Sequence, residues 1–280
     1  MPVTPSDLAS LTTIMRAAAT ARILPRFRNL ETDDVSTKSG PADLVTIADV
    51  EAEADMTAAL RLAMPGALVV GEEAVAAAPH LLDGLGDADR AVILDPVDGT
   101  WNFAKGLSLF GMIAAVTEKG LPVAGVLLDP LLDDWIIATS DGPARLVRHD
   151  GRSVDLQTSR ANLMEQMVGY VPMSHLPRPA RSKVAAQFSE LGRLTSLGCS
   201  CHEYRMLAQG HADFCLSGPK PQPWDHVAGS LIVSRAGGTS RMLDGRSYDA
   251  GVNEGYLLTA SSKRVWDMVA ERLAFLMLGD

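Results

Sequence analysis

The sequence predicts a chain that is α+β in its first half and α/β in its second half. Two long amphipathic patterns open the chain, short β-type runs follow them, and strand and helix patterns alternate from about residue 160. The chain has 280 residues, of which 47% are hydrophobic and 21% are charged. A chain of this length and composition can bury a large core, so we expect a folded globular protein.

Two helices are predicted in the first quarter of the chain. Thr4 provides an N-cap hydroxyl for the first helix, and the helical spacing of apolar residues after it should end near Pro25. The second helix opens near Thr46 and is stopped by Pro65.

The strand patterns predict two lobes. The runs ALVVG, AVILD, LFGMIAAVTEKG, VAGVLLDP, DWIIATS and ARLVRHDG are mostly joined too tightly for crossover helices, which favours a largely antiparallel sheet. The later segments QMVGYV, ARSKVAAQFSELG, RLTSLG, CHEYRMLAQG and ADFCLSG alternate between strand and helix, which is typical of an α/β layer. We therefore expect an N-terminal α+β lobe over residues 1–155 and a C-terminal α/β lobe over residues 156–280.

Charge, hydropathy and cysteine content exclude several classes of protein. The net charge of -9 argues against a general nucleic-acid binder, which would cluster Lys and Arg. The sequence contains neither an apolar run of 18 residues nor a signal-peptide pattern, so we expect a cytoplasmic protein without a membrane partner. The chain has three cysteines, Cys199, Cys201 and Cys215, and this odd number favours reduced thiols over a set of disulfides. The segment Cys199-Cys201-His202 is not followed by the second pair of ligands that a zinc site needs.

The segment ILDPVDGTWNF places acidic residues directly after an apolar run. We expect Asp95 at the end of a strand, because Pro96 lacks the N–H group that would continue the ladder. Asp95 and Asp98 can then point into one space, where two carboxylates raise each other's pKa unless a cation lies between them. Carboxylate oxygens favour Mg²⁺, Mn²⁺ or Ca²⁺. The alternative is an ordinary acidic β-turn, since Asp, Pro and Gly are common turn residues.

Further residues extend this pattern toward phosphate chemistry. The N–H groups of Gly99 and Thr100 could cradle an anion, more strongly if they open a helical turn. Glu72 follows the apolar strand in VVGEEA, and Asp225 opens a predicted helix in KPQPWDHVAG. Taken singly, Glu72 could be a solvated surface acid and Asp225 a first-turn acid favoured by the helix dipole.

The segments GEE, DPVDGTWNF and WDHVAGSLIVSRAGG, in this order and spacing, resemble the inositol monophosphatase family of Mg²⁺-dependent phosphatases. The resemblance runs from about residue 5 to residue 275. It implies a layered αβαβα sandwich of the sugar-phosphatase type, two or three Mg²⁺ ions, a small-molecule phosphate ester as substrate, and a homodimer.

The resemblance also assigns metal ligands. The first metal would be held by Glu72, Asp95 and the carbonyl of Val97. The second would be held by Asp95, Asp98 and Asp225.

The same resemblance implies catalytic and phosphate-binding roles. Gly99 and Thr100 would bind the phosphate with their N–H groups, beside Asp98, and the Thr100 hydroxyl with Glu72 would help to activate a water molecule. The segment KSGPADLVTIAD is similar to a mobile loop and the helix after it. Lys38 would therefore lie near the site, and Asp49 would pair with Thr100 or bind a weaker third metal. The expected reaction is direct attack of water on phosphorus, without a covalent intermediate.

Two departures from the family pattern concern the substrate. The family's inositol phosphatases bind sugar hydroxyls with an acid a few residues before the residue that corresponds to Asp225. An ungapped count places that position at Gly218 in this sequence, and Lys220 lies nearby. Lys220 could bind a second anionic group, or it could be a solvated loop lysine. Glu203 could replace the missing acceptor, or it could belong to an ordinary amphipathic helix.

Inositol monophosphate is the favoured substrate within the class of small sugar and polyol phosphates. Histidinol phosphate, fructose 1,6-bisphosphate and 3'-phosphoadenosine 5'-phosphate are the alternatives, although DGTWNF differs from the DGTKEF of the adenosine-bisphosphate branch. A non-catalytic protein that binds phosphate or metal for regulation is the alternative from another class.

Overall fold

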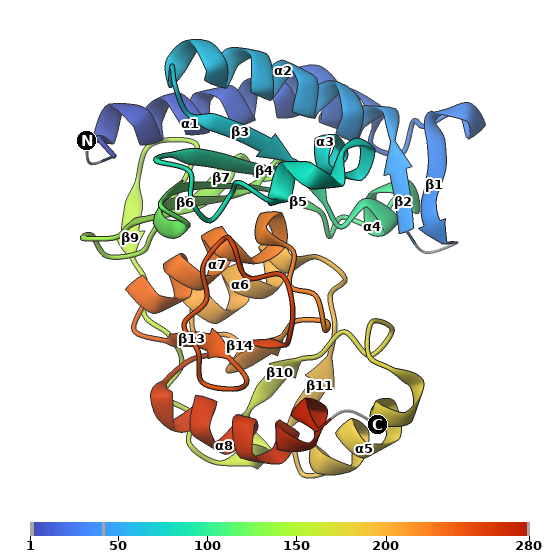
Figure 1. Ribbon diagram of the computed structural model, residues 1–280, viewed down its shortest axis with the longest axis vertical. Helices are drawn as coiled ribbons and strands as arrows, with labels where there is room; N and C mark the ends of the chain where they lie inside the picture. Colours follow the sequence, from blue (N-terminus) through green and yellow to red (C-terminus); the bar gives the residue numbers. More distant parts are fainter. Residues whose placement is uncertain (1–2, 41–42, 279–280) are drawn as a thin grey trace.

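The computed structural model describes residues 3–40 and 43–278 as five stacked layers (Figure 1). In order, these are a helix pair, a seven-stranded sheet, a second helix pair, a five-stranded sheet and a third helix pair. The helix pairs are α1 (Pro5–Ala18) with α2 (Ile47–Ala63), α6 (Ser200–Ala208) with α7 (Pro223–Arg235), and α5 (Arg178–Gln187) with α8 (Lys263–Leu273). The expected αβαβα sandwich is confirmed.

The seven-stranded sheet contains its strands in sequence order. They are β3 (Leu68–Gly71), β4 (Ala91–Asp98), β5 (Gly111–Glu118), β6 (Leu121–Asp129), β7 (Asp134–Thr139), β8 (Arg145–Val147) and β9 (Ser153–Asp155). All neighbours are antiparallel except β3 and β4, which are parallel. The chain between those two strands includes α3 (Glu72–Ala77) and a 3₁₀ turn (Pro79–Leu82), which allow it to return to the start of the sheet. The predicted antiparallel sheet is confirmed apart from this pair.

The five-stranded sheet has the order β11-β10-β12-β14-β13. Its strands are β10 (Val168–Tyr170), β11 (Arg193–Thr195), β12 (Phe214–Leu216), β13 (Thr239–Met242) and β14 (Leu257–Ala260). β10 is parallel to β11 and β12, so the loops that follow these three strands leave from the same edge. Strand β9 ends before residue 156, and the division of the chain into lobes at that point stays a prediction.

The helices at the start of the chain begin where their capping residues predict. The Thr4 hydroxyl accepts a hydrogen bond from the Asp7 N–H, and the chain after α1 continues as π-helical and 3₁₀ turns as far as Arg26. Thr46 caps α2 in the same way. Between the two helices, β1 (Val35–Gly40) and β2 (Asp43–Thr46) form a hairpin that lies beside the short helix α4 (Thr100–Ala104).

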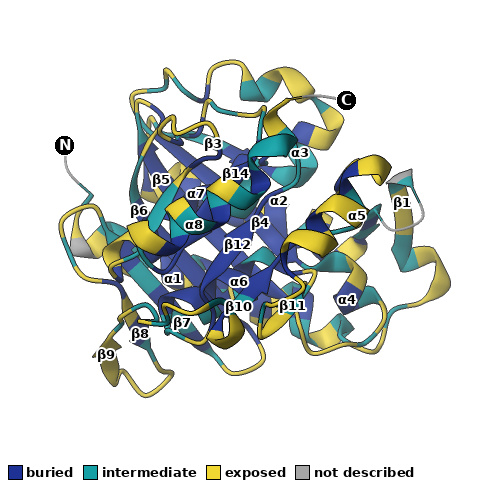
Figure 2. Cartoon of the chain, turned by 90° about the horizontal axis from the view of Figure 1, so that it is seen from below, coloured by how far each residue is buried: buried dark blue, intermediate teal, exposed yellow. Residues whose placement is uncertain are grey.

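The core is concentrated around β4, all of whose residues are buried, whereas β9 is exposed (Figure 2). One apolar cluster, containing Met56 and Leu94, fills the space between the seven-stranded sheet and α1 and α2. Another, containing Ile93 and Ile232, lies on the opposite face, against α6 and α7. Within the described ranges, no helix is long and apolar enough to cross a bilayer.

Candidate active site

The site begins at a β-bulge near the end of β4. Asp95 pairs with Ile113 and Asp98 pairs with Gly111, so three steps along β4 match two steps along β5. The expectation that the ladder stops at Pro96 is therefore wrong: the strand resumes after one extra residue.

The bulge decides which way the acids face. Ile93 packs on the α7 side of the sheet, and regular alternation places Asp95 on that side too. Val97 packs with Leu94 on the α2 side, where an unbroken alternation would not place it. The extra residue therefore returns Asp98 to the α7 side, the face that also carries Asp95.

Three carboxylates meet on this face. One oxygen each from Asp95, Asp98 and Asp225 lies within 4.8 Å of the other two. Asp225 reaches the cluster from the first turn of α7, which packs across β4, β5 and β6. Such a group of oxygens could hold a metal ion, and hard divalent cations such as Mg²⁺ favour these ligands.

Burial and mutual repulsion perturb these acids. Burial raises the pKa of Asp95 far above its ordinary value, and the charges of Glu72 and Asp98 raise it further. Burial likewise raises the pKa of Asp225, with added repulsion from Asp98 and Glu72. The pKa of Asp98 is also raised by burial, although hydrogen bonds from Cys199 and Cys201 oppose the shift. A bound cation would relieve the repulsion within this cluster.

Glu72 is the first residue of α3, directly after β3. Because β3 and β4 are parallel, with Gly71 paired to Leu94, their carboxyl ends lie side by side and Glu72 comes close to Asp95. Lys38 of the hairpin donates to Glu72 Oε1 at 2.7 Å and to Glu73 Oε1 at 2.6 Å. Lys38 therefore lies at the site, as the sequence predicts.

Gly99 and Thr100 follow the bulge and start α4. Gly99 has a φ of 85°, and a Cβ there would lie 2.9 Å from the Leu109 carbonyl oxygen, so glycine is required. The Thr100 hydroxyl is 3.1 Å from Asp49 Oδ1 and 2.9 Å from the Val97 carbonyl oxygen. The pairing of Asp49 with Thr100 is thus present, and burial raises the pKa of Asp49 to about 6.

The N-terminal end of α6 contacts the cluster through Asp98. The Cys199 thiol donates to Asp98 Oδ2 at 3.0 Å, and the Cys201 N–H donates to the same oxygen. The two contacts fix one oxygen of Asp98. The sequence did not predict this role for Cys199, because no local pattern brings residue 199 to residue 98.

The two substrate candidates lie in different surroundings. Glu203 is buried, and its Oε1 accepts hydrogen bonds from the Ser196 hydroxyl at 3.0 Å and the Leu197 N–H at 2.7 Å. Burial raises its pKa to about 7. Glu203 therefore holds the loop before α6 with at least one oxygen. Lys220 is exposed in the loop before α7.

A further acid near the site was not singled out from the sequence. Glu53 lies one helical turn after Asp49 on α2, and its carboxylate binds the first turn of α3. The spacing of four residues between two acids on the buried face of a helix was a usable signal.

The comparisons with known proteins agree with this fold and this acidic cluster. The chain belongs to the inositol monophosphatase family, whose sequence model matches residues 7–276. The family consists of metal-dependent phosphatases, and a phosphate ester is consistent with it as substrate.

Individual relatives carry different names. The chain is 28% identical over 224 residues to the chloroplastic bifunctional phosphatase IMPL2 of Arabidopsis thaliana, covering 80% of this chain but only 59% of that protein. It is 31% identical over 244 residues to an inositol-1-monophosphatase of Mesorhizobium japonicum, covering 85% and 86% of the two chains. It is 28% identical over 254 residues to the Nus factor SuhB of Haemophilus influenzae, covering 86% and 88%.

A solved structure has the same fold. The Thermotoga maritima IMPase superposes with a TM-score of 0.78 at 23% identity, over 96% of this chain and 98% of that one.

Proposed function

We propose that the protein is a Mg²⁺-dependent phosphomonoesterase that hydrolyses a small sugar or polyol phosphate. The main observation behind this proposal is that carboxylate oxygens of Asp95, Asp98 and Asp225 lie within 4.8 Å of one another. They lie next to Gly99, the N-cap residue of α4. Clustered acids beside the first N–H groups of a helical turn are suited to a cation and a phosphate together.

The residues present fit the expected metals. The three aspartates would hold one ion, and Glu72, Asp95 and the Val97 carbonyl are the ligands proposed for another. A third ion near Asp49 belongs to the same proposal. Bound Mg²⁺ supplies Lewis acidity, which lowers the pKa of water and neutralises charge on the phosphate.

The protein groups then orient the reactants. Asp49 accepts a hydrogen bond from the Thr100 hydroxyl, so the hydroxyl could take a proton from the attacking water while it passes its own proton to the Asp49 carboxylate. The N–H groups of Gly99 and Thr100 would bind phosphate oxygens, since first-turn N–H groups lack acceptors within their own helix. Together, these groups would place water, phosphorus and leaving alcohol in line.

The next question is which alcohol carries the phosphate group of the substrate. Inositol monophosphate is the favoured substrate, in keeping with the relative named inositol-1-monophosphatase. Position 218 is glycine, where family members that bind inositol would have an acid, and Lys220 is exposed nearby. Histidinol phosphate, fructose 1,6-bisphosphate and 3'-phosphoadenosine 5'-phosphate are therefore alternative substrates. Glu203 and Lys220 are proposed as the residues that contact this part of the substrate.

A regulatory, non-catalytic role is the second candidate. The observation that favours it is the relative named Nus factor SuhB. The net charge of -9 argues against a direct nucleic-acid partner. The proposal also includes a cytoplasmic location and a homodimer. The exposed apolar side chains of Trp101 and Leu107 support a protein–protein contact beside α4.

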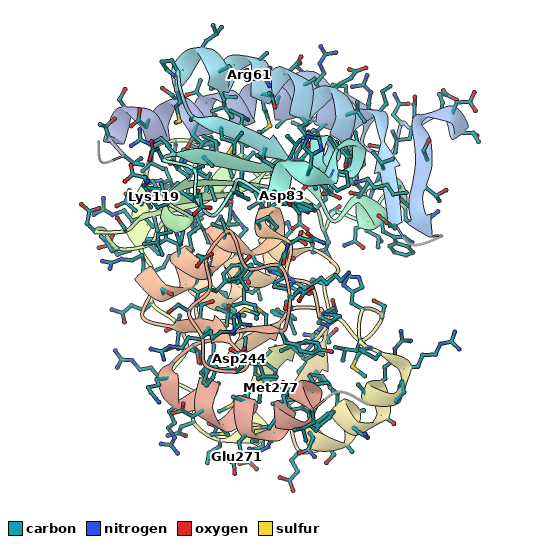
Figure 3. All side chains as sticks on the ribbon, in the orientation of Figure 1. Arg61, Asp83, Lys119, Asp244, Glu271 and Met277 are labelled. Carbon is teal, nitrogen blue, oxygen red and sulfur yellow. The ribbon has the colours of Figure 1, made fainter. Side chains whose placement is uncertain are left out.

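Phosphate release from the four candidate substrates, with Mg²⁺ or with EDTA, tests the proposal. Asp98→Asn should abolish Mg²⁺-dependent turnover, whereas Asp83→Asn, which removes an exposed acid labelled in Figure 3, should retain it. Turnover that survives in Asp98→Asn, or a trapped phospho-enzyme, would contradict the direct two-metal mechanism. Absence of turnover on all four substrates would favour the regulatory role.

A further inference from the structure

Glu53 is a buried acid whose hydrogen bonds lead to a functional segment. Only 6% of its surface is exposed, although ionised side chains are seldom buried without partners. Its Oε2 accepts from the Glu73 N–H and its Oε1 from the Ala74 N–H, both at 2.8 Å. Both oxygens of the carboxylate therefore bind the backbone of α3.

These hydrogen bonds cap the N-terminus of α3, whose own N-cap residue makes no side-chain hydrogen bond. The N-cap position of α3 is Gly71, which offers no side chain to accept from the first-turn N–H groups. A Cβ at Gly71 would lie 2.2 to 2.6 Å from the carboxylate atoms of Glu53. Glycine at position 71 thus creates the space in which Glu53, from another helix, takes the place of a capping residue.

We propose that Glu53 is a positioning residue that fixes Glu72 at the candidate metal site by anchoring the first turn of α3. Glu73 and Ala74 follow Glu72 directly, so fixing their N–H groups fixes the backbone that carries the Glu72 carboxylate. The inference rests on the proposed function, in which Glu72 is a metal ligand.

Lys38 contacts the same turn in a different way. It binds the carboxylates of Glu72 and Glu73 themselves, whereas the hydrogen bonds described for Glu53 come from main-chain N–H groups and leave the Glu72 carboxylate available. Of these two side chains, Glu53 is therefore the one that can hold α3 in place whether Glu72 pairs with Lys38 or binds a metal ion.

The position of Glu53 on α2 links two parts of the site. Asp49, one turn earlier, accepts from the Thr100 hydroxyl, so the same helical face anchors the segment after β3 and the segment after β4. Helix α2 therefore sets the position of Glu72 relative to Thr100.

Glu53→Gln is the variant that tests this role, with Glu51→Gln as its matched control. The amide keeps one acceptor oxygen but presents an NH₂ group to the second N–H donor of α3. Glu51 lies two residues earlier on α2 and pairs with Arg22 and Arg26 away from α3. In Glu53→Gln we expect the Kd for Mg²⁺, measured by calorimetry, to rise about tenfold, as is typical for residues that orient metal ligands. Glu51→Gln should leave the Kd unchanged.

Hydrogen exchange gives a readout that does not need metal or substrate. In EDTA, residues 72–77 of Glu53→Gln should lose amide protection while β4 keeps it. Gly71→Ala should reproduce both effects, because its Cβ displaces the Glu53 carboxylate; in a Glu53→Ala background the same change should add little.

The outcomes separate the two proposals. An unchanged Kd for Mg²⁺ and unchanged protection of residues 72–77 in Glu53→Gln would overturn the positioning role. Loss of cooperative melting in this variant would also overturn it, because Glu53 would then support the whole fold. A wild-type chain that bound no Mg²⁺ would refute the proposed function, while the exchange measurement would still decide whether Glu53 anchors α3.

Discussion

Replacing Asp225 by Asn should stabilise the metal-free protein and, in the same molecule, remove its stabilisation by Mg²⁺. Asp225 contributes one of the three clustered carboxylates and comes from the first turn of α7. Without a cation, its charge repels those of Asp95 and Asp98, and the nearly isosteric Asn removes this repulsion. With Mg²⁺, the same substitution removes a ligand.

The size of the effect follows from the geometry. Two unit charges 4.8 Å apart repel by about 3 kcal/mol at an effective dielectric constant near 20. Proton uptake limits the cost, because the raised pKa values of Asp95 and Asp225 favour protonation of part of the cluster. We therefore expect Asp225→Asn to gain about 2 kcal/mol of unfolding free energy in EDTA at pH 8, or about 4 °C in Tm.

The pH dependence of the gain has a definite sign. A carboxyl group whose pKa is raised by folding binds more protons in the folded state than in the unfolded state. The stability of the metal-free wild type therefore falls as pH rises above the ordinary aspartate range near 3.9. Asp225→Asn lacks one such group, so its advantage should shrink between pH 8 and pH 5.

Thermal melting of both proteins in EDTA and in 10 mM Mg²⁺ checks these expectations. At about 100 times its Kd, Mg²⁺ should stabilise the wild type by about 3 kcal/mol and the variant by much less, so that the order of the two Tm values reverses. Asp83→Asn controls for the change of net charge at an exposed position (Figure 3). A lower Tm for Asp225→Asn in EDTA, or an equal shift of both proteins by Mg²⁺, would refute the reasoning.

Three further predictions concern the same site. Thr100→Ala and Asp49→Asn should each lower kcat by about 10²-fold with little change in KM, because they disturb proton transfer rather than binding; steady-state kinetics would contradict this if KM alone changed. Gly99→Ala should destabilise the protein by at least about 2 kcal/mol in urea melts, because φ is 85° and the Cβ meets the Leu109 carbonyl; a variant as stable as wild type would show that α4 can shift. Mg²⁺ should bind more tightly at pH 8 than at pH 5.5 and release protons, because the cluster has raised pKa values; calorimetry in two buffers of different ionisation enthalpy measures this, and equal heats and affinities would count against it.

Much of the fold was readable from local patterns. The caps at Thr4 and Thr46, the tightly linked strands and the later alternation of strands and helices each depend on neighbouring residues, so the order of elements along the chain followed from local patterns, whereas the layered arrangement was implied by the family resemblance. Glu72 after β3 and Asp95 within β4 were likewise visible, because each lies at the end of an apolar run.

The details of the site were decided by tertiary contacts. The bulge in β4 depends on pairing with β5, and it turns Asp98 to the face of Asp95. The Cys199 thiol meets Asp98 across 101 positions of sequence, a contact that no local pattern encodes. Glu203 binds the loop before its own helix because that loop folds back over the first turn of α6.

The sequence by itself indicated the metal and phosphate chemistry that we propose, because acids and glycines near the ends of strands are visible in local patterns. Only the tertiary structure decided that Asp225 joins Asp95 and Asp98, and that Glu53 on α2 anchors α3. The physical reason is that strand and helix patterns fix the direction of a side chain along its own element, whereas distances between elements depend on sheet register and helix packing.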